Sequence, residues 1–268
     1  MTPQNGNSGD NGAAAPQAQP KPNYRGFLQI FSAPTQLGRQ PIERGGAIVA
    51  TGLLLYVLCF TIAQVIATSS PAVVEANALQ MYESLDKALA DSLITQEDYT
   101  ANRESMEIYF KNPITSGFIT QQVTTGFVGG LFYIMIIGGI LWLFVRMLTE
   151  SPPAFIDVAA LAGYSVAIGG LGMIVTGLMQ ATGGSLLYSP SPALLYAVST
   201  RQLDVVTVTL LNANLFDIWK YAAVGIATAA AAGMKSSRGL LFGLIAFIIM
   251  FAFMSATTVL NYMAMHMM

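Results

Sequence analysis

The sequence predicts an all-α membrane protein: a polytopic bundle of about five transmembrane helices with a small helical loop outside the membrane. Of its 268 residues, 54% are hydrophobic and only 10% are charged, whereas a soluble domain carries about 25% charged residues. Apolar runs long enough to cross a hydrocarbon core about 30 Å thick recur along the chain. Within these runs small residues repeat at helical spacing, which is typical of helices that pack against one another in a bilayer.

Two segments at the amino terminus are predicted to lie outside the bilayer core. Residues 1–24 are rich in Pro, Gln, Asn and Gly, and we expect them to form a disordered cytoplasmic tail. Residues 25–45 form a short amphipathic segment that we expect to lie at the membrane interface. Its apolar side chains, expected at the headgroup level, are Phe27, Leu28, Ile30 and Phe31.

Five spans are expected within a membrane domain over residues 46–268. They cover about 46–68, 126–147, 157–179, 216–233 and 239–259. The connection over residues 185–211 is partly apolar, but Pro and Ser interrupt it, which favours an interfacial or re-entrant helix. The alternative, a sixth span in this connection, would move the carboxyl terminus to the inner side.

The distribution of Lys and Arg predicts that the amino terminus is cytoplasmic. With that orientation the inner side holds Lys21, Arg25, Arg39, Arg44, Arg146, Lys235 and Arg238. The outer side holds only Lys87, Arg103, Lys111 and Arg201. An odd number of spans then places the carboxyl terminus outside, and we expect the protein in a bacterial inner (cytoplasmic) membrane.

The loop over residues 69–121 is the sizeable segment that we expect outside the bilayer. Apolar residues at roughly helical spacing predict a helix over 74–93, and Thr95 before an acidic turn predicts another over about 96–110. Eight acids and three bases lie between Glu75 and Lys111. Such a charge run is commonly a solvated face; the functional alternative is a docking surface for an outer partner.

Small residues predict which helix faces pack closely. Gly126 and Gly130 form a GxxxG pair in the second span. Gly225, Ala229 and Gly233 recur every fourth residue in the fourth span, so they line one face and let a neighbouring backbone come near. We therefore expect the fourth span to be the most buried helix of the membrane bundle.

No catalytic, cofactor-binding or metal-ligating constellation is visible in the sequence. His266 is the only histidine, so neither a Ser–His pair nor a site with two histidines can form. Asp217 and Lys220 are three residues apart at the outer end of the fourth span. We expect them to pair on one helical face as an interfacial anchor.

Polar residues elsewhere in the membrane domain are few. Asn212, Asn214 and Gln180 are either ordinary boundary residues or the lining of a polar vestibule. The spans carry neither the mid-span acids nor the broken helices expected of a coupled transporter. The candidates to line a polar path through the bundle are Ser165, Thr176, Thr228, Ser255 and Thr257.

Several segments follow a recurring membrane-protein pattern: IFSAPTQL before the first span, the acidic outer loop, DVAALAGYS in the third span, and LFDIWKYAAVGI. Together they resemble the Yip-type (Ypt/Rab-interacting protein) membrane family, in its bacterial branch, over most of the chain from about residue 27. The sharpest positions are Phe216, Ile218, Trp219 and Gly225. Family members often carry a proline shortly after the tyrosine of the third span, whereas Tyr164 is followed here by SVAIGG.

The resemblance implies five membrane helices, a cytoplasmic amino terminus and no enzymatic activity. Eukaryotic members are described as trafficking adaptors that contact Rab GTPases through the cytoplasmic amino terminus. Two functions from different classes follow for this chain. One is a non-enzymatic scaffold or adaptor that contacts partner proteins; the other is a small-molecule transport component or an accessory subunit of an export system.

The expected partners are the lipid bilayer and other membrane proteins, or further copies of the chain. Nucleic acid is excluded, because the net charge is −2 and no basic stripe is present. A continuous polar path through the bundle distinguishes the two functions, since an adaptor has no need of one.

Overall fold

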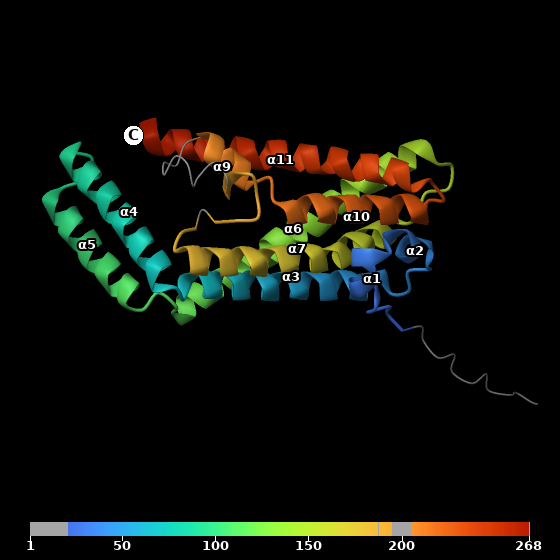
Figure 1. Cartoon of the computed structure of the whole chain (residues 1–268), viewed down its shortest axis with the longest axis horizontal. Coiled ribbons are helices and arrows are strands. Elements are labelled where there is room, and N and C mark those ends of the chain that lie inside the picture. Colours follow the sequence, from blue (N-terminus) through green and yellow to red (C-terminus); the bar gives the residue numbers. More distant parts are fainter. Residues whose placement is uncertain (1–20, 187, 195–204, 268) are drawn as a thin grey trace, which may run out of the picture.

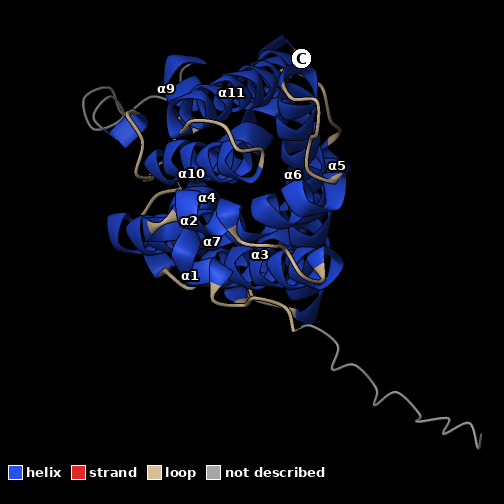
Figure 2. Ribbon diagram, turned by 90° about the vertical axis from the view of Figure 1, so that its right-hand side faces the viewer, coloured by secondary structure: helices blue, strands red, loops and turns tan. Residues whose placement is uncertain are grey.

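The computed structural model describes residues 21–186, 188–194 and 205–267, and the regular elements within them are all helices (Figure 1). Most of the expected tail over residues 1–24 lies outside the described residues. Figure 2 views the helices nearly end on and shows them gathered side by side into one bundle. The predicted fold class, an all-α bundle of membrane helices, is confirmed.

Four helices are long and apolar enough to cross a membrane, so the protein is multi-pass. They are α3 (Gly45–Thr68), α6 (Ser116–Leu148), α7 (Phe155–Gly183) and α11 (Ser236–Met267). The fourth expected span corresponds to α10 (Leu215–Ala231), which has 17 residues. Its length of about 25 Å is less than a hydrocarbon core requires, so α10 is a shorter element than the sequence predicts.

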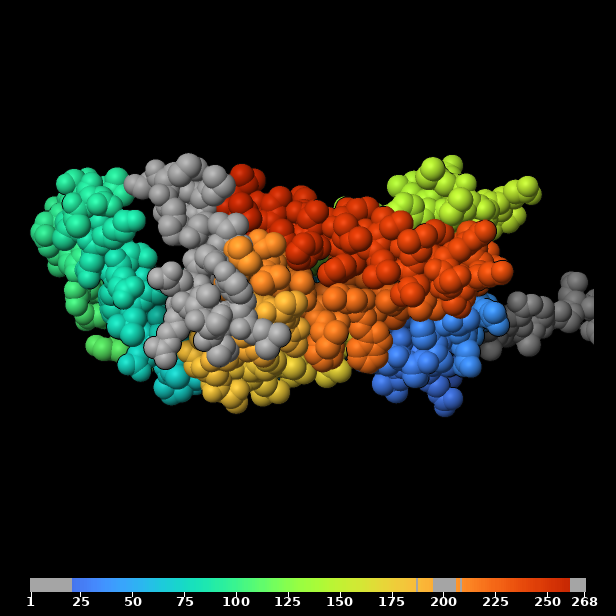
Figure 3. Space-filling view, turned by 45° about the horizontal axis from the view of Figure 1, so that its top comes forward, coloured from blue at the N-terminus to red at the C-terminus, as the bar shows by residue number. Residues whose placement is uncertain are grey.

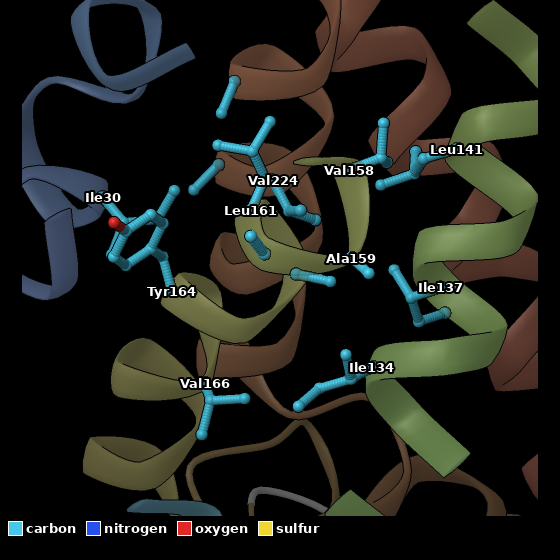
Figure 4. Close-up of a cluster of buried hydrophobic side chains, with 14 of the residues drawn as sticks. Ile30, Ile134, Ile137, Leu141, Val158, Ala159, Leu161, Tyr164, Val166 and Val224 are labelled. Atoms are coloured by element: carbon cyan, nitrogen blue, oxygen red, sulfur yellow. The ribbon is translucent and has the colours of Figure 1, made fainter. Parts of the chain in front are cut away.

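The core lies around α7, which is buried along most of its length, as is α10. Figure 4 shows Leu161 and Val158 of α7 between Leu141 of α6 on one side and Ile30 and Tyr164 on the other. Helix α3 runs along α7, and α11 runs along α10. The bundle therefore consists of long helices arranged about a buried central helix.

The amphipathic segment forms α1 (Gly26–Ser32) and α2 (Pro34–Arg39), which pack on α7 and α10. Ile30 and Leu37 are fully buried, and the Tyr164 hydroxyl donates a hydrogen bond to the Asn23 carbonyl at 2.7 Å. The space-filling view shows α1 and α2 against α10 (Figure 3). Of the four apolar side chains expected at the headgroup level, Leu28 is largely exposed and Ile30 is buried against the bundle, and the interfacial placement of the segment stays a prediction.

The predicted small-residue contacts exist, but they join helices of the same chain. Gly126 and Gly130 face α3, where a Cβ on Gly130 would lie 2.9 Å from the Tyr56 ring. A Cβ on Gly225 would lie 2.6 Å from the backbone nitrogen of Gly243 in α11, and Ala229 contacts Gly239 of the same helix. These residues allow the close backbone approach that replaces a hydrophobic drive between helices in lipid.

Gly233 does not belong to this packing face. Helix α10 ends at Ala231, and Gly233 lies in the following turn with a φ of +69°. Nothing lies within 4 Å of the position that a Cβ would take on this residue. Its role is to adopt the left-handed backbone conformation, which costs other residues about 1 kcal/mol or more. The periodic spacing therefore extends beyond the end of the helix itself.

The loop over residues 69–121 forms an antiparallel hairpin of α4 (Pro71–Ala90) and α5 (Gln96–Lys111), the two helices that the sequence predicts. Thr95 and Asp98 form the capping box that starts α5. The Tyr99 hydroxyl joins the two helices by donating to Asp86 at 2.7 Å. Figure 1 shows this hairpin at the opposite end of the bundle from α1 and α2.

The connection between α7 and α10 is not a sixth span within the residues described. It contains α9 (Val205–Leu211), only seven residues long, and residues 187 and 195–204 lie outside the description. The backbone N–H of Leu215 donates to the Pro190 carbonyl at 3.0 Å, so this connection folds back onto the start of α10. The choice between an interfacial and a re-entrant path stays a prediction.

We expect a Gly225→Leu substitution to destabilise the bundle strongly, because a side chain there meets the backbone of α11 and forces α10 and α11 apart. Overpacking typically costs about 1–3 kcal/mol, and backbone contact places this change at the upper end. Gly139→Leu is the matched control, since nothing lies within 4 Å of its Cβ position in α6. Thermal unfolding in detergent measures both; equal midpoints for the two variants would contradict the packing described.

Candidate functional site

A cavity of about 490 Å³ lies among the membrane helices, and it is the site that the structure offers for a small molecule. This volume is within the range of ligand pockets, about 300–1,000 Å³. Its walls come from five helices, α3, α6, α7, α10 and α11, and from the connection that precedes α10. The cavity therefore lies where the long helices meet the short one.

A charged pair forms part of the cavity wall. Lys220 Nζ donates to Asp217 Oδ1 at 2.5 Å across one turn of α10. The Lys220 side chain is only 8% exposed, whereas that of Asp217 is 37% exposed. The two residues pair as predicted; both line the cavity, and the lysine is the more buried of the two.

Aromatic rings surround the ammonium group of Lys220. Its Nζ lies 4.3 Å from the centre of the Tyr133 ring and 5.1 Å from that of Tyr221. The Tyr133 hydroxyl is held in turn by Ser165 at 2.7 Å. A desolvated cation over an aromatic face gains about 2 kcal/mol. The rings and the carboxylate together compensate a charge that would otherwise be costly to bury.

The pair lies at mid-depth in the bundle and not at its outer edge. The Lys220 stem rests on Gly169, halfway along α7, with its Cδ 3.0 Å from the Cβ position of that glycine. Tyr133, which contacts its ammonium group, is halfway along α6. The interfacial placement is therefore wrong for Lys220, whose side chain lies level with the middle of α6 and of α7.

An irregular segment between two helices brings further polar groups to the cavity, two turns along α7 from the level of Lys220, since Asn214 lies beside Thr176 and Lys220 beside Gly169. Helix α9 ends at Leu211 and α10 starts at Leu215, and the residues between them include Asn212 and Asn214. Asn214 caps α10 by accepting from the Phe216 N–H at 2.9 Å, and its Nδ2 lies 3.4 Å from Thr176 Oγ1. The sequence predicts a short helix before the fourth span, interfacial or re-entrant, and α9 is a short helix at this place.

The predicted polar candidates divide into two groups. Asn212, Asn214 and Gln180 line the cavity, so the vestibule interpretation is the one that the structure supports. Of the weakly polar candidates, Thr176 lines it, whereas Ser165, Thr228, Ser255 and Thr257 are not among its lining residues.

The four positions that carry the family resemblance lie in different surroundings. Phe216 lines the cavity and fits against Gly172. Trp219 packs edge-on against Phe31 of α1, with ring centres 5.3 Å apart. Ile218 is half-buried, and Gly225 lies farther along α10 against α11. The LFDIW segment is therefore divided between the cavity and the packing of α1.

The lining also includes residues that reasoning from the sequence missed, namely Tyr56, Tyr133, Tyr221 and Gln64. A signal for one wall was present: Tyr56, Phe60, Ala63 and Gln64 follow helical spacing and all line the cavity. Polar side chains repeating on one face of an otherwise apolar span indicate a wet or protein-facing surface. The convergence of four further helices on that face has no counterpart in local sequence.

Among the described residues no three His, Cys, Asp or Glu side chains gather as a metal site would require. Comparison of the chain with protein-family models, curated proteins and solved structures finds no match. The site is therefore interpreted from its own geometry.

Removing one member of the pair should destabilise the protein, and unequally. Asp217→Asn leaves a buried ammonium without its counter-charge, whereas Lys220→Met leaves a carboxylate that is partly exposed. One-sided removal from a buried pair costs about 3–5 kcal/mol, so we expect Asp217→Asn to approach that range and Lys220→Met to fall below it.

The double variant Asp217→Asn, Lys220→Met should recover most of the loss, since no charge stays buried. Thermal unfolding in detergent of wild type, the two single variants and the double variant completes a double-mutant cycle. Additive losses in the double variant would show that the two side chains do not act as a pair.

Proposed function

We propose that this chain is a non-enzymatic component of small-molecule transport that binds its ligand in the cavity between the membrane helices. The observation that carries the proposal is the Asp217–Lys220 pair, held at mid-depth in the wall of an open cavity. Ionisable groups in the bilayer are costly and mark substrate or ion pathways in membrane proteins. An interfacial anchor has no need of a cavity or of such depth.

The helix break supports the same function. Transporters commonly place their ligand sites near the midplane, at discontinuous helices whose irregular backbone lines a cavity. The chain around Asn212 and Asn214 has this arrangement, with its polar groups toward the cavity and its backbone held by Pro190 and Asn214. A residue pair on an uninterrupted helix would offer fewer free polar groups to a ligand.

The small-residue faces do not favour a scaffold. Gly126 and Gly130 are covered by α3, and Gly225 and Ala229 are covered by α11. Faces that are used inside the chain cannot also bind a second protein. Assembly through these faces, on which the scaffold hypothesis depends, would require the bundle to open.

For orientation we propose a cytoplasmic amino terminus in a bacterial inner membrane, with the α4–α5 hairpin and the carboxyl terminus outside. The short α10–α11 turn, with Lys235 and Arg238, lies at the same end of the bundle as α1 and α2. Arg146 lies near the end of α6 beside Trp142, 4.8 Å from the ring centre. Basic residues gathered at one end with an aromatic anchor are typical of the cytoplasmic interface.

The transport proposal predicts that a small molecule accompanies the protein from its native membrane. We expect native mass spectrometry of gently purified wild-type protein to show ligand-sized adducts, and the Asp217→Asn, Lys220→Met variant to lose them. Gly139→Leu, which touches no neighbour, is the control and should retain them. Identical adducts on wild type and double variant would argue against a ligand in this cavity.

An adaptor of the Yip type is a second proposal, and the α4–α5 hairpin is the observation that favours it. The hairpin extends beyond the bundle, and its acids Glu83, Glu97 and Glu104 are exposed. A protruding acidic surface attracts a basic partner and orients its approach.

The adaptor proposal predicts crosslinks between this hairpin and one defined protein in native membranes. Replacing Glu83, Glu97 and Glu104 by Lys should abolish those crosslinks, because the charge attraction becomes repulsion. Glu43→Lys with Glu150→Lys makes the same chemical change at exposed positions away from the hairpin and should leave them intact. Crosslinks that survive charge reversal would exclude the hairpin as the docking surface.

A further inference from the structure

We infer that the ligand is a membrane amphiphile with a zwitterionic headgroup, which reaches the cavity from the bilayer between α6 and α11. The inference rests on the proposed function and specifies the class of molecule that the site takes. It follows from three properties of the cavity: a lining divided into polar and apolar parts, an opening on the lipid-facing surface, and a balance of charge.

The lining has a polar side and an apolar side, although α3, α7 and α10 contribute residues of both kinds. The polar side chains around the start of α10 are Asn212, Asn214, Asp217, Lys220, Thr176 and Gln180. The side chains that α11 and the neighbouring part of α6 contribute are all apolar except Tyr133, namely Phe132, Phe247, Met250, Phe251 and Met254. A water-soluble solute would leave the second wall without a partner, whereas an amphiphile covers both.

The cavity opens on a surface that faces lipid. Phe132 and Met254 line it and are also 46% and 48% exposed, on α6 and α11 respectively. Phe132 of α6 stacks on Phe253 of α11 at this edge of the cavity, with ring centres 6.4 Å apart. Gly129, one turn from Phe132, lines the cavity on the side of α3, where its Cβ position lies 3.6 Å from the Tyr56 hydroxyl oxygen. A hydrocarbon chain can therefore pass from the bilayer into the cavity without first crossing water.

The charge balance selects the headgroup. Asp217 and Lys220 are the charged residues among the described lining, and they cancel each other. The first N–H groups of α10 are already bonded: Leu215 donates to Pro190, Phe216 to the Asn214 side chain, and Asp217 to the Asn214 carbonyl. An anionic headgroup therefore finds no uncompensated positive charge and no free helix N-terminus among the described residues of the lining.

A zwitterionic headgroup matches the hydrogen-bond donors of Lys220 and the acceptor positions of Asp217 that the ion pair leaves unused. The Lys220 ammonium has three N–H donors, one of which goes to Asp217, and the carboxylate accepts at more than one position. The negative part of a zwitterionic headgroup can accept from Lys220 while its positive part approaches the exposed side of Asp217. The complex then has no net charge in a low-dielectric site, which limits the desolvation cost.

The test uses the full chain, stripped of lipid in detergent and examined by native mass spectrometry with three probes. These are phosphatidylethanolamine, phosphatidylglycerol with the same acyl chains, and glycerophosphoethanolamine, which has the first headgroup without chains. We expect wild type to retain phosphatidylethanolamine about tenfold more tightly than phosphatidylglycerol, and not to retain the chain-free headgroup. Gly129→Leu should lose the lipid by filling the cavity beside Tyr56, whereas the control Gly139→Leu should retain it.

Each other result overturns part of the inference. Equal retention of the two lipids would exclude a zwitterionic preference, and full retention by a folded Gly129→Leu variant would exclude this cavity as the lipid's site. Retention of the chain-free headgroup without either lipid would exclude an amphiphile but leave the transport proposal standing. If no probe binds and the Asp217→Asn, Lys220→Met variant behaves as wild type, both the inference and the proposed function fail.

Discussion

The close approach of α10 to its neighbours is the constraint on which the rest of the structure depends. Gly169 and Gly172 of α7 leave the space that the Lys220 stem and the Phe216 ring occupy, and Gly243 of α11 admits the backbone of α10 on its other side. Larger residues at these positions would push α10 outward and separate the charged pair from Tyr133. In a bilayer, where apolar burial gives no preference for helix contact over lipid contact, this steric fit determines the arrangement. The cavity thus depends on glycines that do not themselves bind anything.

That same fit explains how a lysine is tolerated at mid-depth. Burying an ion costs several kcal/mol, and attraction to one carboxylate does not always offset this. Here the cation has further partners, the faces of Tyr133 and Tyr221, and Tyr133 is itself fixed by Ser165. The partial exposure of Asp217 reduces its own desolvation. The pair is consequently asymmetric: the protein holds Lys220 on several sides, whereas Asp217 is the more accessible to a ligand.

Much of the fold could be predicted from sequence because its signals are local. The spans at 46–68, 126–147, 157–179 and 239–259 are continuous apolar runs, and each corresponds to a helix of similar or greater length. The capping pattern at Thr95 and the spacing of Gly225 and Ala229 likewise depend on neighbouring residues. The depth of a residue within the bundle is not a local property, because it depends on where its helix begins relative to the other helices. The residues around Asp217 have the mixed aromatic and charged composition that is typical of a helix end at the membrane surface. They do lie at a helix end, the start of α10, but this helix end is packed among the other helices of the bundle. The burial of Ile30 was missed for a related reason: an amphipathic face packs equally well on lipid headgroups or on protein.

The shortness of α10 accounts for the polarity of the cavity. Seventeen residues give about 25 Å of helix, whereas the 29 residues of α7 give about 43 Å, so irregular chain must occupy part of the depth beside α7. Backbone groups in irregular chain cannot face hydrocarbon unsatisfied, and they are stable at such depth only within protein or along a wet cavity. Pro190 and Asn214 satisfy the groups at the break, and Asn212 reaches Thr258 of α11. A full-length helix in this place would need none of these residues and would also close the cavity. The break is therefore the structural cause of the site, and the charged pair one turn farther along the helix gives that site its chemistry.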